Sequence, residues 1–225
     1  MNAVKAIFMK QMADLPKNFA GLGVFLLWPL MAFVMGSMMG DMDVQAGMFA
    51  AMLIGSGPMM TIANNVAEDN EYKGLRFLVM AGVKPWQYLL GLAGSMFIAS
   101  AVSLAALILI GGFTGDVLLR LIIVAVLGLI ASSILGGAVG IFSRNVQKAS
   151  AITTPLMMVL AFTPLFAGSN ETVERIAEFL FPYQVLMVVL NPYADFVRAL
   201  IVVGGNAVVL LAFFAIAYKK KGLRG

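Results

Sequence analysis

Six apolar stretches, each long enough to cross a lipid bilayer, are the feature that most constrains the fold of this chain. A helix needs about 20 mainly apolar residues to cross about 30 Å of hydrocarbon. We place the six spans at residues 19–40, 46–67, 86–113, 117–142, 149–168 and 196–218. Backbone polar groups find no water inside a bilayer, so these spans must be helices. The sequence therefore predicts an all-α integral membrane protein with one transmembrane domain over residues 1–225.

The composition leaves no room for a soluble domain beside the spans. The chain is 61% hydrophobic and 12% charged, whereas soluble domains are about 45–50% apolar and about 25% charged. It contains neither Cys nor His, which excludes disulfides, thiolate metal sites and imidazole ligands. No P-loop motif is present, so we expect no nucleotide, cofactor or metal site in this chain. The net charge of +4 comes from the distribution of basic residues in the loops, so we expect no nucleic-acid partner. The composition alone does not exclude an aspartyl membrane protease.

The longest polar interruption is residues 68–85, EDNEYKGLRFLVMAGVKP, between the second and third spans. It carries six charged residues: Glu68, Asp69, Glu71, Lys73, Arg76 and Lys84. Between these charges, apolar and small residues recur at helical spacing, at Tyr72, Leu75, Leu78, Val79 and Gly82. This pattern indicates a short amphipathic helix at the membrane surface. The alternative is a solvated loop whose charges only stop translocation.

The first 17 residues are too charged for the apolar core of a signal peptide. Val4, Phe8, Met12 and Leu15 follow one another at spacings of four, four and three residues. Such a stripe is typical of an amphipathic helix lying in the membrane interface, and we expect an interfacial helix over residues 1–17. The alternative is a disordered basic tail.

Residues 172–192, before the last span, consist of two parts that are each too short to cross the membrane, and three charges and a proline argue against one continuous seventh span. A helical stripe is interrupted by Glu174, Arg175 and Glu178, and Pro182 separates it from a short apolar run at residues 183–190. We predict a broken re-entrant hairpin in the outer leaflet, which needs protein or water around its irregular backbone. Its characteristic residues are Ile176, Leu180, Pro182 and Tyr183. The alternative is a pair of helices resting on the membrane surface.

Six spans distribute the basic residues very unevenly between the two sides of the membrane. One side receives twelve Lys and Arg residues, including those of residues 1–17, 68–85 and 219–224, and the other receives Arg120, Arg175 and Arg198. By the positive-inside rule, both termini and residues 68–85 are cytoplasmic. We expect a multi-pass protein of the cell's plasma membrane, in direct contact with the lipid bilayer.

The interior of the spans lacks the groups that drive ion-coupled transport. No ionisable side chain falls near the middle of any span, whereas such carriers usually keep intramembrane charges as relays. We find no internal repeat of the kind that builds many secondary transporters. Gly36-x-x-x-Gly40 and Gly136-x-x-x-Gly140 allow helices to approach closely, but glycine is common in membrane helices and these motifs alone do not define a dimer face.

These features together resemble the membrane subunit of ABC exporters of the ABC-2 type. The resemblance covers nearly the whole layout: an amphipathic N-terminal helix, six spans, a cytoplasmic loop between spans two and three, and a broken hairpin before span six. The sequence resemblance is clearest over residues 68–91. The residues that carry it are Glu68, Glu71, Gly74-Leu75-Arg76, residues 77–79, Val83-Lys84-Pro85 and residues 88–91. One departure is Gly74, where threonine is more usual in the family, and glycine weakens a helix start.

The resemblance implies a non-enzymatic permease that works with a separate ABC ATPase subunit, which binds ATP and Mg. Two permease subunits, identical or different, form the transport path. Residues 68–85 are then the coupling helix, with Leu75 and Leu78 in a cleft of the ATPase and Glu68 and Glu71 paired with cationic groups of the ATPase or of the N-terminal helix. Since the spans lack charge, we expect export of an amphipathic or apolar cargo, such as a peptide, drug or lipid-linked molecule. The alternatives are a membrane scaffold or assembly protein and a secondary carrier or channel not coupled to ATP.

Overall fold

The computed structural model describes residues 3–17, 19–168, 170–191 and 196–221, with the backbone alone at 19–20, 75–76, 79, 85 and 217–221. Over these residues the chain forms helices and no strands. The elements are α1 (Ala3–Asp14), the 3₁₀ turn η1 (Leu15–Lys17), α2 (Phe19–Met39), α3 (Met42–Glu71), α4 (Gly74–Met80), α5 (Pro85–Gly111), α6 (Gly115–Phe142), α7 (Val146–Ala167), α8 (Glu171–Ala177), α9 (Phe181–Leu190) and α10 (Phe196–Lys221).

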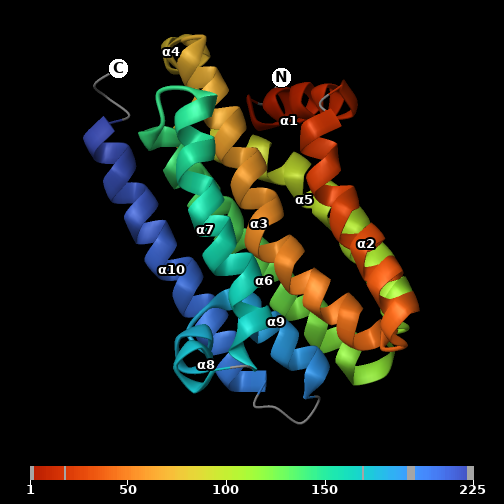
Figure 1. Cartoon of the computed structure of the whole chain (residues 1–225). Coiled ribbons are helices and arrows are strands. Elements are labelled where there is room, and N and C mark those ends of the chain that lie inside the picture. Colours follow the sequence, from red (N-terminus) through yellow and green to blue (C-terminus); the bar gives the residue numbers. More distant parts are fainter. Residues whose placement is uncertain (1–2, 18, 169, 192–195, 222–225) are drawn as a thin grey trace.

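Six of the described helices, namely α2, α3, α5, α6, α7 and α10, are long and apolar enough to span a membrane. They correspond one to one with the predicted spans, so the six-span prediction is confirmed. The chain runs back and forth along the bundle and places α1, α4 and the C-terminal end of α10 at one end, and α8 with the C-terminal end of α9 at the other (Figure 1). We call these the α4 end and the α9 end.

Helix α3 is the centre of the bundle. Nearly all of its span is buried, whereas α2 and α10 leave most of their residues exposed, and α2, α5, α6, α7 and α9 all pack against it. Pro58 lies inside α3 and lacks the N–H that an uninterrupted helix uses. At the next residue, the N–H of Met59 donates to the Ser132 hydroxyl of α6 at 3.2 Å. A neighbouring helix thus satisfies a backbone group beside the proline, as buried membrane helices require.

Glycines of α6 allow this helix to lie directly against α3. A Cβ placed on Gly136 would stand 2.5 Å from the Met59 carbonyl oxygen, and one on Gly140 would stand 2.5 Å from the Cβ of Val66. Real Cβ atoms do not come this close to other atoms, so the α3–α6 interface depends on the absence of side chains at both positions. The Gly136-x-x-x-Gly140 motif therefore serves packing within the chain.

The polar stretch between spans two and three differs from its prediction in extent. Helix α3 continues to Glu71, so Glu68 and Glu71 belong to the second span helix rather than to a separate surface helix. The short helix, α4, has seven residues, and both Tyr72 and Gly82 lie outside it. The extension is physically simple: residues 68–71 are charged or amide residues that continue α3 beyond the apolar region without a glycine or proline to stop it.

At the α9 end, two short helices stand where the sequence predicted a broken hairpin. Helix α8 has seven residues and α9 has ten, so neither reaches across a bilayer. Helix α9 is almost entirely buried against α3, α6, α7 and α10. The turn between them is hydrogen-bonded to its neighbours: Gln184 donates to the Glu178 carbonyl at 2.6 Å, and Asn206 of α10 donates to the Phe179 carbonyl at 2.9 Å. That the pair dips into the outer leaflet stays a prediction.

Candidate functional site

The α4 end is shaped by two sharp, well-defined turns around a short helix. Lys73 has φ 58°, the left-handed conformation that turns the chain out of α3. Gly82, with φ 77°, ends α4, and the Val83 N–H closes the turn on the Leu78 carbonyl at 3.0 Å, as in a Schellman motif. Pro85 then starts α5, while the Lys84 N–H donates to the Gln87 side chain at 2.9 Å. Helix α4 is thus joined to two spans by short, hydrogen-bonded connections.

The outer face of α4 is apolar and exposed. Phe77 and Met80 expose 66% and 73% of their surfaces, and Tyr72, just before the helix, exposes 75%. Leu78 instead is half-buried and packs against the hydrophobic core of its own chain. The side chains of Leu75, Arg76 and Val79 lie outside the described residues. Among the described side chains of α4, Phe77 and Met80 are the large apolar ones that are exposed, and the amphipathic stripe of the sequence did not include them.

Asp69, on the last turns of α3, joins this helix to α1 and α5. Its carboxylate accepts a 2.5 Å hydrogen bond from the Tyr88 hydroxyl of α5 and lies 3.6 Å from the Lys10 ammonium of α1. One turn earlier, the Asn65 amide donates to the Gln11 side chain of α1 at 3.2 Å. The carboxylate that binds the N-terminal helix is thus Asp69, and not Glu68 or Glu71. The sequence has three acidic residues here, and none of its features distinguishes Asp69 from the other two.

The same end of α3 also forms hydrogen bonds with the C-terminal end of α6 and the N-terminal end of α7. Asn70 donates to the backbone carbonyls of Gly140 and Ser143 at 3.2 and 3.1 Å, which binds the C-terminal end of α6. The Glu71 carboxylate accepts from the Val146 N–H, at the first residue of α7, at 3.3 Å. A carboxylate at a helix N-terminus is favoured by the helix dipole. A displacement of α4 would therefore act through α3 on α1, α5, α6 and α7.

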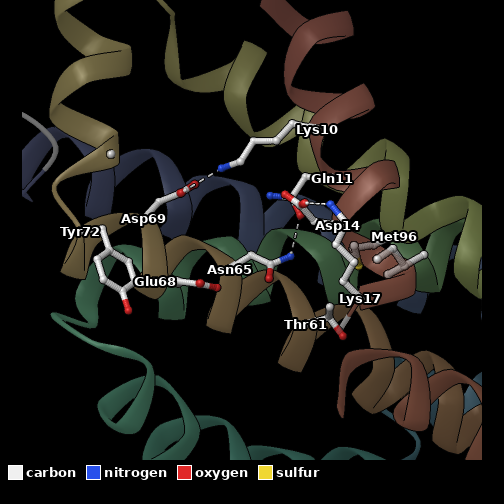
Figure 2. A pocket seen from close by; sticks show the side chains of 12 residues that line it. Lys10, Gln11, Asp14, Lys17, Thr61, Asn65, Glu68, Asp69, Tyr72 and Met96 are labelled. Atoms are coloured by element: carbon white, nitrogen blue, oxygen red, sulfur yellow. Dashed lines mark hydrogen bonds and ion pairs between the residues drawn. The ribbon is translucent and has the colours of Figure 1, made fainter. Parts of the chain in front are cut away.

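Beneath α1, a pocket of about 600 Å³ opens between α1, η1, α3 and α5. Figure 2 shows its side chains, with the Lys10–Asp69, Gln11–Asn65 and Lys17–Asp14 contacts on the side of α1. Glu68, Tyr72 and Gly74 line it as well. A Cβ on Gly74 would meet Asp69 atoms only at 3.4 Å, an ordinary contact, so the structure leaves room for a Cβ at this position.

The predicted hairpin residues separate into exposed and buried ones. Ile176 of α8 is 59% exposed, Leu180 is half-buried, and Pro182 and Tyr183 of α9 are buried. The Tyr183 hydroxyl donates to the Glu174 carboxylate at 3.3 Å. Burial raises the pKa of Tyr183 above its ordinary value, and the negative charge of Glu174 raises it further. The hydroxyl therefore stays protonated at physiological pH and keeps its role as a donor.

Within the described residues, no group of three or more Asp and Glu side chains could hold a metal ion. The α4 end consists of a short helix, on which Phe77 and Met80 are exposed, attached to a buried central span whose end contacts four other helices through hydrogen bonds and an ion pair. The α9 end closes the bundle with two short helices.

This architecture is that of a polytopic helical membrane protein with a short helix between its second and third spans. Residues 43–219 match the ABC-2 family transporter protein family, and the chain belongs to that family. It is thus a membrane component of an ABC transporter, and its family implies association with an ABC ATPase subunit. No curated protein matches the chain.

Proposed function

We propose that this chain is the permease subunit of an ATP-driven exporter, and that α4 is the element on which the ATPase acts. The observation that carries the proposal is the exposed apolar pair Phe77 and Met80 on a short helix joined to α3. Large apolar side chains in this position gain about 1.5–3 kcal/mol each when a partner buries them. Because the end of α3 is bonded to α1, α5, α6 and α7, movement of α4 changes the arrangement of the bundle.

The partner ATPase binds ATP and Mg in this proposal, and the permease itself binds neither. A second permease subunit, identical or different, completes the transport path. The cargo is amphipathic or apolar, such as a peptide, a drug or a lipid-linked molecule, because the middle of the spans contains no charged side chain that would bind a charged solute.

The test is to purify the chain with its ATPase subunit and measure their affinity for Phe77→Asp and Met80→Asp variants. Each substitution places a charge where an apolar contact is expected, so we expect affinity to fall about 10- to 100-fold, together with permease-stimulated ATP hydrolysis. Leu78→Asp is expected to act differently and to lower the thermal stability of the permease itself, since Leu78 packs inward.

Phe179→Asp is the matched control, because Phe179 is similarly exposed, at 71%, but lies at the α9 end. It should leave the affinity for the ATPase unchanged. Unchanged affinity in both α4 variants would remove α4 as the docking element. A chain that carries no ATPase partner and supports gradient-driven flux alone would instead be a secondary carrier, and one that supports no flux with or without the ATPase would be a scaffold.

A further inference from the structure

The pocket beneath α1 is deep compared with the polar headgroup layer of a membrane. Its lining runs along α3 from Tyr72, just past the helix end, down to Thr61. Eleven helical residues correspond to about 16 Å along the axis. On α5, Met96 lies eleven residues after Pro85, at a similar depth. The polar headgroup layer occupies only about 5–8 Å on each side of a bilayer. The predicted second span ends at residue 67, and Thr61 lies six residues before that end, so the span prediction places this part of the pocket within the hydrocarbon layer.

The chemistry of the lining changes along this depth. Five lining side chains are charged, namely Lys10, Asp14, Lys17, Glu68 and Asp69, and they come from α1, η1 and the C-terminal end of α3. Thr61, the lining residue of α3 farthest from that end, and Met96 of α5 are uncharged. A ligand that matches such a gradient has a charged head and an apolar remainder. The volume of about 600 Å³ is within the range of about 300–1,000 Å³ found for small-molecule sites.

The charges of the pocket favour a head that carries an amine. Lys10 pairs with Asp69 at 3.6 Å and Lys17 with Asp14 at 3.4 Å. Glu68 is the fifth charged group, and its carboxylate makes no hydrogen bond or ion pair with another described residue, so the described lining has one more carboxylate than ammonium group. A purely anionic head would meet this carboxylate and be repelled. A primary ammonium can donate up to three hydrogen bonds to it, and a phosphate can bind the exposed ammonium groups of Lys10 and Lys17.

We propose that this pocket binds an amine-bearing zwitterionic phospholipid of the phosphatidylethanolamine type. The amine of its headgroup binds Glu68, the phosphate binds Lys10 and Lys17, and the acyl chains leave past Thr61 and Met96. The lipid then lies between α1 and α3, next to the Asn65–Gln11 and Asp69–Lys10 contacts that join these helices. The proposal does not depend on ATP coupling, because it concerns the permease subunit alone.

The experiment is a native mass spectrometry titration of the purified chain in detergent with dioctanoyl phospholipids that share the same tails. We expect phosphatidylethanolamine to bind about tenfold more tightly than phosphatidylglycerol, which has no amine. Phosphatidylcholine should also bind more weakly, because its quaternary amine cannot donate hydrogen bonds. Free phosphoethanolamine, which has the head without tails, separates a lipid site from a site for a soluble zwitterion and should bind weakest.

Glu68→Gln removes the excess carboxylate with little change in shape at an exposed position, and we expect it to abolish the preference for phosphatidylethanolamine over phosphatidylglycerol. Asp43→Asn is the matched control, an exposed carboxylate on the same helix at the opposite end of the bundle, and should keep the preference. Equal affinities for the three lipids, an unchanged preference in Glu68→Gln, or free phosphoethanolamine binding as tightly as the lipid would each overturn the proposal.

Discussion

At the scale of single residues, glycine decides how closely the two most buried spans can pack. Gly136 faces the backbone of Met59, and Gly140 faces Val66 and the backbone of Ala63. A backbone atom cannot swing aside as the end of a side chain can. Close packing of this kind is a main source of stability between membrane helices, where lipid removes the hydrophobic driving force. These two glycines thus fix the position of α6 against α3.

Gly136→Ala should therefore destabilise the protein. Its new Cβ would stand 2.5 Å from the Met59 carbonyl oxygen and 2.9 Å from the Met59 Cα, so α6 must move away from α3. Overpacking of this kind costs about 1–3 kcal/mol. We expect the Tm of the purified chain, followed by circular dichroism in detergent, to fall by several degrees. Gly204→Ala on α10 is the control: its Cβ would meet no atom within 4 Å, and an equal loss of Tm there would contradict the explanation.

The residues at the end of α3 show what a sequence can and cannot resolve at this scale. The polar character of residues 68–71 is evident in the sequence, and on this basis the sequence predicts a functional site there. The partners are not evident, because Asp69 contacts Lys10 and Tyr88, which lie 59 and 19 positions away in the chain. Which of three neighbouring acids faces α1 depends on the helical phase of α3 and on the site where α1 crosses α5.

At the scale of elements, the sequence predicted the apolar length of each span well, but it predicted the residues at which the helices end less well. Charged residues 68–71 end the apolar run without ending the helix, so hydropathy placed the end of α3 too early. The turn at Lys73 could not be foreseen, since a lysine in a left-handed conformation has no distinctive pattern. The sequence predicted that the segment before α10 is broken, and the structure has two short helices there, with the break at residues 178–180.

The turn between α8 and α9 leads to a further prediction, because a side chain of α10 donates a hydrogen bond to its backbone. Asn206 lies ten residues into α10, about 15 Å along its axis, and its amide donates to the Phe179 carbonyl. Asn206→Leu removes this donor. The net contribution of one such hydrogen bond is about 0.5–1.5 kcal/mol, so we expect a slightly lower Tm and faster proteolysis at the turn.

Val208→Leu is the control for this variant. Val208 is 68% exposed on the same helix, so the substitution changes only an apolar surface. It should leave both Tm and proteolysis unchanged. If Asn206→Leu were equally harmless, the hydrogen bond to Phe179 would not hold the turn in place.

At the scale of the whole molecule, the alternation of six apolar runs with short polar connections fixes the path of the chain. Each span must start at the end of the bundle where the previous one stopped, and this sends α4 and both terminal regions to one end and the α8–α9 pair to the other (Figure 1). The sequence also predicted the family to which residues 43–219 belong. The packing of α3 at the centre could not be predicted, since its apolar run is no more hydrophobic than those of the outer spans.

The orientation of this bundle in the membrane follows from its charges. With six spans, the sequence assigns twelve of the 15 Lys and Arg residues to the side of the α4 end and three to the side of the α9 end, and basic residues are retained on the cytoplasmic side. We therefore predict that the α4 end is cytoplasmic. The chain contains no Cys, so single cysteines report accessibility without background. Lys84→Cys and Arg144→Cys, both at exposed positions of the α4 end, should resist an impermeant maleimide in intact cells and react after permeabilisation. Asp43→Cys and Thr172→Cys, exposed at the α9 end, should react in intact cells. The reverse pattern would invert the bundle and place α4 where no cytoplasmic ATPase could reach it.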